Sequence, residues 1–227
     1  DRGSDIVASG GSETTFRFLA YFGRINYNYD GRYFLKVSGR YEGSSRFGEE
    51  NRYGFFPAAS AGWVLTEEDF IPSGDILSRL KLRTSFGVTG NAGIGNFPSL
   101  GLWSASTYAG DSGMSPIQIQ NQSLQWEQTQ EVTLGLDYEL FDSRVTGSID
   151  LYRKTTEDLL LDLNMPATTG FLDQTRNVGE VRNRGLEFLI ETQNLTGDFS
   201  WSSNFNISFN RNEVTDLRGQ VLTGGFI

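Results

Sequence analysis

Apolar and polar residues alternate along two short runs of this chain, from Tyr21 to Tyr29 and from Tyr33 to Tyr41. In each run every second residue is aromatic, aliphatic or glycine, and the residues between them are mostly Arg, Lys, Asn or Ser. A period of two is typical of a β-strand with one apolar and one polar face. The runs are joined by Asp30-Gly31, a pair that tolerates the positive φ angles of a tight hairpin turn. The sequence therefore predicts a β-hairpin with tyrosines on its apolar face.

Six further segments show the same alternation, so we expect an all-β chain that forms an antiparallel up-and-down meander of about eight strands. The sixth strand is expected to continue toward Leu161, and Pro57 to mark a strand start or a bulge. Thr66 is expected to cap a short helix, followed by a second short turn over residues 75–79. The predicted strands lie near residues 16–29, 33–41, 55–65, 80–89, 131–140, 145–152, 186–192 and 199–210.

The connections between these strands alternate in length. Three are short turns and a fourth is moderate and partly helical: 30–31, 141–143, 195–198 and 66–79. Three are long loops, the second of them without any sustained period: 42–54, 90–123 and 164–181. Outer-membrane barrels have short turns at one end and long loops at the other, whereas a β-sandwich has loops at both ends. Tyrosines beside short turns, such as Tyr29, Tyr33 and Tyr138, also fit an aromatic belt at a membrane surface. The pattern favours an arc of a large transmembrane β-barrel.

The composition limits the chemistry that this chain can perform. Its 227 residues include neither cysteine nor histidine, which removes disulfides, thiolate metal sites and the commonest general base. No nucleophile–base pair is visible, so we expect no enzyme and assign no catalytic, cofactor-binding or metal-ligating residue. The net charge of -9 disfavours a nucleic-acid partner. The chain lacks a run of about eighteen apolar residues, which excludes a transmembrane helix but not barrel strands of about 9–11 residues.

A series of motifs along most of residues 16–210 resembles the SusC/RagA-type TonB-dependent outer-membrane transporters. The series opens with YFGRINYNY at 21–29, followed by Gly31-Arg32-Tyr33 and by EGSSRFG at 42–48. Its later members, in order, are FPA at 56–58, SAGW at 60–63, EEDF at 67–70, LKLR at 80–83, SFGVTGN at 85–91, WE at 126–127 and LGLD at 134–137. Such an ordered series is far more specific than any one of its motifs.

The resemblance implies a location in the bacterial outer membrane and a barrel of roughly twenty-two strands closed around a plug. Residues 1–227 are then expected to be one partial barrel domain without the plug, completed by strands that lie in further segments of a longer protein or on a separate chain. The implied activity is uptake of oligosaccharides or peptides together with a SusD-like surface lipoprotein. The implied contacts are outer-membrane lipid and, through segments missing here, the TonB complex.

Candidate site residues fall into two groups. Charged residues on the polar faces are expected to face the barrel lumen, where a mutual charge network is favoured over ligand contact: Arg24, Arg32, Lys36, Arg40, Lys81, Arg83, Asp137 and Glu139. Three aromatic residues in or beside the longest loop are candidates for stacking on sugars or packing on the lipoprotein, with packing inside the loop as an equal alternative: Trp103, Tyr108 and Trp126.

A soluble carbohydrate-binding β-sandwich remains the alternative fold, because the aromatic, Gly and Asn content allows it. It predicts a second sheet packed against the apolar face. A barrel predicts an uncovered apolar band on that face instead.

Overall fold

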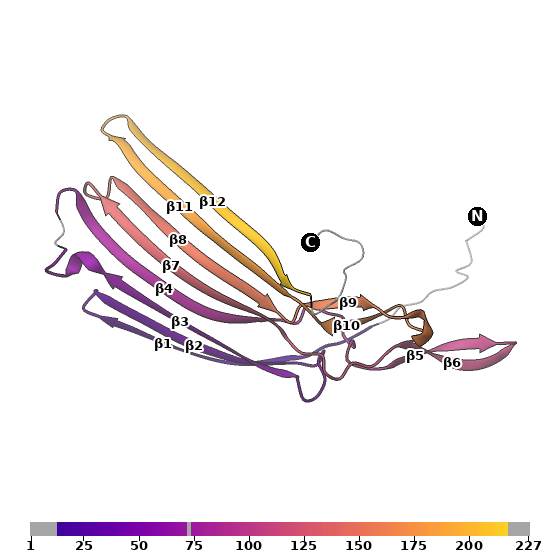
Figure 1. Cartoon of the computed structure of the whole chain (residues 1–227). Coiled ribbons are helices and arrows are strands. Elements are labelled where there is room, and N and C mark those ends of the chain that lie inside the picture. The colour runs from indigo at the N-terminus through magenta and orange to yellow at the C-terminus, as the bar shows by residue number, and fades with distance from the viewer. Residues whose placement is uncertain (1–12, 72–73, 218–227) are drawn as a thin grey trace, which may run out of the picture.

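The chain folds around one curved sheet of eight antiparallel strands (Figure 1). The computed structural model describes residues 13–71 and 74–217. In spatial order the strands are β1 (Phe18–Tyr29), β2 (Tyr33–Ser44), β3 (Tyr53–Val64), β4 (Leu77–Asn91), β7 (Glu127–Leu140), β8 (Val145–Glu157), β11 (Glu180–Thr196) and β12 (Ser200–Asp216). The predicted meander of about eight strands is therefore confirmed.

Two small hairpins are inserted into this meander. The first pairs β5 (Leu102–Tyr108) with β6 (Asp111–Gln118), and the second pairs β9 (Leu160–Asn164) with β10 (Asp173–Asn177). Both lie at the end of the sheet opposite the β1–β2 turn (Figure 1). We call this the long-connection end, and the end with the turns after β1, β3, β7 and β11 the short-turn end. The alternation of connection lengths is thus present in the structure.

The hairpins correct three expectations about the long connections. Residues 90–123 are not irregular, since they contain the end of β4 and the β5–β6 hairpin. This hairpin gave no apolar period because its strands are rich in Ser, Thr and Gly. Its turn at Ala109-Gly110 has positive φ angles of 51° and 96°. The predicted loop 164–181 likewise holds β10, the 3₁₀ turn η2 (Ala167–Thr169) and the start of β11. The sixth strand does not reach Leu161 because Asp158, with φ 55°, separates β8 from β9.

The region between β3 and β4 also differs from expectation. Thr66 does not cap a helix: it lies inside the 3₁₀ turn η1 (Leu65–Glu67), whose N-cap is Val64, and its Oγ1 accepts a hydrogen bond from the Leu80 amide at 3.3 Å. Residues 77–79 belong to β4 and form no second turn. Pro57 lies within β3, neither at its start nor at a bulge. The ladder from β3 to β4 begins only after Pro57, which has no N–H to donate.

One face of the sheet is apolar and uncovered. Its side chains are partly exposed in every part of the sheet, for example Ile25 at 73%, Leu134 at 48% and Phe205 at 55%. Within the part of the chain that the structure describes, no second sheet packs on this face. The β-sandwich alternative is therefore wrong. No described helix is long and apolar enough to cross a membrane.

The compact apolar cluster lies at the long-connection end. It contains one buried residue of β3 and four buried residues of the connections after β2 and β4: Phe56, and Phe47, Ala92, Leu124 and Trp126. The buried side chains therefore gather mainly where the long connections meet, whereas the strands of the main sheet leave both their apolar and their polar face partly exposed.

Candidate functional site: the polar face of the sheet

The strand register brings polar side chains from distant segments into rows across one face. One row contains Phe34 of β2, Gly62 of β3, Arg83 of β4, Gly135 of β7 and Asp150 of β8, each paired with the next. Because side chains of cross-strand pairs project from the same face of a sheet, these residues are neighbours. The row spans 116 positions of sequence between its two ends (150 minus 34), so no local motif could reveal it.

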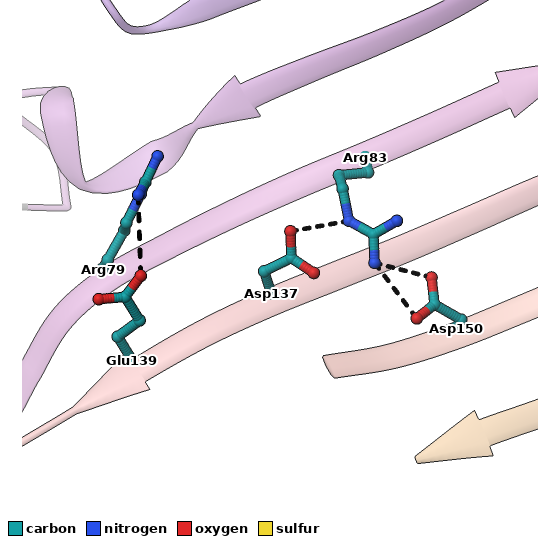
Figure 2. Close-up of polar contacts among 5 residues, drawn as sticks. All are labelled: Arg79, Arg83, Asp137, Glu139 and Asp150. Atoms are coloured by element: carbon teal, nitrogen blue, oxygen red, sulfur yellow. Dashed lines mark hydrogen bonds and ion pairs between the residues drawn. The ribbon is translucent and has the colours of Figure 1, made fainter. Parts of the chain in front are cut away.

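Arg83 is the centre of a charge network (Figure 2). Its Nε donates to Asp137 Oδ2 at 2.7 Å, and its Nη2 donates to Asp150 Oδ1 at 2.9 Å. Gly135 lies between these partners: a Cβ there would stand 2.3 Å from Asp150 Oδ1 and 2.8 Å from Arg83 Nη2. Only glycine at position 135 leaves room for the Arg83 guanidinium to extend across β7 and reach Asp150 in β8. The sequence pointed to Arg83 and Asp137 but missed Asp150, whose partnership is visible only in the register.

A second ion pair lies on the same face, nearer the short-turn end (Figure 2). Arg79 Nη1 is 3.7 Å from Glu139 Oε1, and Glu139 Oε2 accepts a hydrogen bond from Ser143 Oγ at 2.8 Å. Arg79 was also absent from the sequence candidates, because residues 75–79 were expected to form a short turn. Its register partner in β7 is Glu139 itself.

Lys81 takes a different course from Arg83. Its ammonium stands 4.7 Å from the centroid of the Phe34 ring, across β3. Gly62 lies under this crossing, where a Cβ would be 3.1 Å from Lys81 Cε. The side chains of Lys81 and Arg83 therefore leave β4 in opposite directions, and each passes over a glycine of the neighbouring strand.

A cavity of about 420 Å³ opens on the polar face beside Lys81 and Arg83. Its polar and aromatic lining includes Asn26, Asn28, Phe34, Lys36, Lys81 and Arg83. Of the remaining predicted cations, Arg24 lies exposed in β1, and Arg40 Nη2 donates to Glu42 Oε1 at 2.7 Å. Arg32 lies in the β1–β2 turn, with its Nε 3.4 Å from Asp30 Oδ2. Among residues 13–71 and 74–217, no group of three or more acidic side chains could hold a metal ion.

The three loop aromatics have different settings. Trp103 lies in β5 with 60% of its surface exposed. Trp126 is only 4% exposed, and its Nε1 donates to the Arg52 carbonyl at 3.1 Å, so its indole packs inside this chain. Tyr108 is the last residue of β5, and its side chain lies outside the described residues.

A carboxylate at the short-turn end binds two aromatic side chains. Glu68 Oε1 accepts hydrogen bonds from Tyr33 Oη at 2.5 Å and from Trp63 Nε1 at 3.0 Å. These hydrogen bonds, from Tyr33 first and then Trp63, lower the pKa of Glu68 below its ordinary value. Glu68 thereby ties the connection after β3 to the ends of β2 and β3. The sequence showed only an acid in a presumed helix start.

Comparisons with known proteins agree with this architecture. Residues 3–225 match the family model described as "TonB dependent receptor-like, beta-barrel". TonB-dependent receptor P39 of Formosa agariphila is 40% identical over 227 residues, covering 98% of this chain and 22% of that protein. TonB-dependent receptor SusC of Bacteroides thetaiotaomicron is 40% identical over 211 residues, covering 88% and 21%. The chain thus spans about a fifth of the length of the curated relatives that it matches.

Solved structures give the same result. The RagAB peptide transporter matches with a TM-score of 0.84 and 32% identity, over 91% of this chain and 23% of that chain. The siderophore receptor PirA of Pseudomonas aeruginosa, at 15% identity and a TM-score of 0.56, shares the fold alone. The relatives are receptors and transporters, in keeping with the expectation that the chain is no enzyme. Because the family model matches nearly its whole length, the chain belongs to the TonB-dependent receptor-like β-barrels of the bacterial outer membrane.

Proposed function

We propose that residues 1–227 form one partial domain, an arc of the wall of a transporter barrel that imports oligosaccharides or peptides. The observation that carries this proposal is a single sheet with an uncovered apolar face opposite a charged face. In outer-membrane barrels the apolar face meets lipid and the polar face lines the lumen. The charged residues of the polar face then stand beside the path of the cargo. The remaining strands, the plug and the contact with the TonB complex belong to other segments of the full-length protein.

The cargo class and the partner are supported by the relatives. One is SusC, and a solved relative is named as a peptide transporter. We propose a SusD-like surface lipoprotein as partner, bound at the long-connection end. This end faces the cell exterior in the proposed barrel, because outer-membrane barrels have their short turns in the periplasm and their long loops outside. The exposed Trp103 on the β5–β6 hairpin is the aromatic side chain best placed for that contact.

Import itself is tested in cells that carry the full-length protein. Labelled oligosaccharides and labelled peptides are supplied separately, and uptake is compared with that of cells lacking the protein and of cells depleted of the proton gradient. We expect uptake of one class that requires both the protein and the gradient. Equal uptake by all three kinds of cell contradicts the proposal.

The assignment of the apolar face to lipid and of the polar face to the lumen is tested by charge substitution at two adjacent residues of β7. Leu134→Arg puts a cation on the apolar face, and we expect it to reduce the unfolding free energy of the full-length protein in lipid vesicles by about 2–4 kcal/mol. Thr133→Arg is the control on the polar face, where an arginine stays in water. Similar losses for both substitutions contradict the assignment of faces.

A further inference from the structure

A row of three arginines crosses the apolar face of the sheet on the neighbouring strands β8, β11 and β12 (Figure 1). The strand registers pair Arg153 with Arg184 and Arg184 with Arg211, so the three residues stand side by side. Arg153 is two residues from Leu151, which places the row on the apolar face. In the described strands β1, β2, β3, β4 and β7, the register places no charged residue on this face. The arginine row is therefore a local feature of one side of the arc.

The row lies at the edge of the apolar band nearest the long-connection end. From Val145, the first residue of β8, to Arg153 the strand has nine residues, and their register partners are residues 184–192 of β11 and 203–211 of β12. About 9–11 residues of a tilted strand cross the hydrocarbon core of a bilayer. In the proposed barrel the arginines therefore stand where the hydrocarbon of the outer leaflet ends and its headgroups begin.

The strands that surround Arg153 and Arg184 are all present in this chain. β8 lies between β7 and β11, and β11 lies between β8 and β12. The strands that close the barrel attach beyond β1 and β12, and a plug fills the lumen on the opposite face. Both arginines are exposed, and neither forms an ion pair or a hydrogen bond with another described side chain. Closure of the barrel thus adds a neighbouring strand only to Arg211, on the edge strand β12.

The acidic residues of this face stand farther from the apolar band than the arginines do. Glu213 is the register partner of Arg182, one row beyond, and Arg182 Nη2 donates to Glu180 Oε1 at 3.0 Å. Glu157 is the register partner of Glu180, one row farther still. In the described chain none of these carboxylates lies within ion-pairing distance of the arginine row. Because like charges directly opposite each other in a sheet repel, an anion from outside the chain would stabilise the row.

We propose that the arginine row binds a phosphate group of lipid A, the phosphorylated glycolipid that anchors lipopolysaccharide in the outer leaflet. Guanidinium groups bind phosphate oxygens through two parallel hydrogen bonds, and basic clusters at a membrane surface attract anionic headgroups. An exposed apolar row lies directly below the arginines and offers a surface for the acyl chains of the same lipid: Leu151, Leu186 and Phe209.

This match to both parts of an amphiphile favours a lipid over a soluble anion. The inference rests on the proposed assignment of the apolar face to lipid and of the long-connection end to the cell exterior. It adds a lipid site on the outer wall of the barrel, separate from the path of the cargo.

Lipid binding to the purified full-length protein in detergent micelles tests the inference. The probes are lipid A and the same lipid A after removal of its phosphates, each added at increasing concentration. Native mass spectrometry counts the lipid molecules bound to each protein. We expect the wild type to bind the phosphorylated lipid about tenfold more tightly, as charge-assisted hydrogen bonds give.

Arg184→Gln is the decisive variant, because it removes the charge at the centre of the row and keeps an extended polar side chain. We expect it to lose most of the preference for phosphate, and the double variant Arg153→Gln, Arg184→Gln to bind both lipids equally. Lys154→Gln is the matched control: it removes one positive charge from the residue next to Arg153, on the polar face, and should keep the full preference. Binding of the dephosphorylated lipid should be the same in all four proteins.

Three results overturn the inference: no preference for phosphate in the wild type, an unchanged preference in the double variant, or an equal loss in Lys154→Gln. A wild type without the preference leaves the row to carboxylates of a partner protein. Failure here is separable from failure of the transport proposal, because uptake of cargo in the cell assay does not require a lipid site on the outer wall. The Leu134→Arg test reports separately on whether the apolar face meets lipid.

Discussion

The two ends of the sheet use tryptophan in opposite ways. At the long-connection end Trp126 is 4% exposed, and its ring lies 5.0 Å from that of Phe47 and 5.3 Å from that of Phe56. At the short-turn end Trp63 is partly exposed, stacks on Tyr33 at 6.2 Å and donates its Nε1 hydrogen to Glu68. Trp126 thus fills an apolar core, whereas Trp63 links the exposed apolar face to the polar connection that contains Glu68.

The difference follows from what each end must do. The long connections project past the strands (Figure 1), so they require an apolar cluster of their own. The short turns need no such cluster. Their aromatic rings lie on the apolar face with the polar tips at the strand ends, where phenol and indole groups favour a membrane interface. Substitutions at the two ends should therefore differ in magnitude and in their dependence on pH.

The largest effect is expected at Trp126. Trp126→Ala removes a buried ring and leaves a cavity, so the unfolding free energy of the full-length protein should fall by about 3–5 kcal/mol in urea titrations. Trp63→Ala loses one hydrogen bond and the ring contacts with Tyr33 and Phe70 at a partly exposed surface, and should cost roughly 1–2 kcal/mol. If Trp63→Ala is as damaging as Trp126→Ala, the contrast between the ends is wrong.

Gly90 tests how tightly the cluster at the long-connection end is packed. A Cβ at Gly90 would stand 2.2 Å from Cζ of Phe56, which is held against Trp126. Gly90→Ala should thus destabilise the protein by about 1–3 kcal/mol, measured in the same titrations. Gly87→Ala, in the same strand, places its Cβ 3.6 Å from that of Ala58 and should change stability little. Equal effects at both glycines would show that Phe56 moves aside freely.

The smallest effect is expected at Glu68 and depends on pH. Hydrogen bonds from Tyr33 and Trp63 lower the pKa of Glu68, so the folded state favours its ionised form. The stabilisation is present above the ordinary pKa of a glutamate and is lost as pH falls through the lowered pKa of the folded state. Glu68→Gln should lower the melting temperature at neutral pH, and the difference from wild type should shrink toward about pH 3. A difference that does not vary with pH shows that the charge of Glu68 contributes nothing.

The strands of the main sheet were predictable because each has a persistent period of two. The tight turn at Asp30-Gly31 was also predictable, and its positive φ angles of 52° and 66° agree with it. The β5–β6 hairpin was missed because a hairpin that stands apart from the sheet has no buried face to impose an apolar period. Thr66 was misread because a threonine followed by acidic residues is typical of a helix N-terminus, whereas this segment forms the three-residue 3₁₀ turn η1.

The candidate site was predictable in part. The alternation identified the charged residues of the polar face, and the family resemblance placed that face in a barrel. The partners of these charges were not predictable, since Arg83 passes its neighbouring strand to reach Asp150 and Lys81 turns away from Asp137. Trp126 could be assigned to a core only once its indole was seen to bond to the Arg52 carbonyl, 74 positions away.

The sequence by itself determined the strands of the main sheet, their two faces and the alternation of short and long connections, because these depend on residue order within short segments. Only the tertiary structure decided which charges pair with one another. Those choices depend on the register between strands and on Gly62 and Gly135, whose missing side chains let a lysine and an arginine cross to more distant strands.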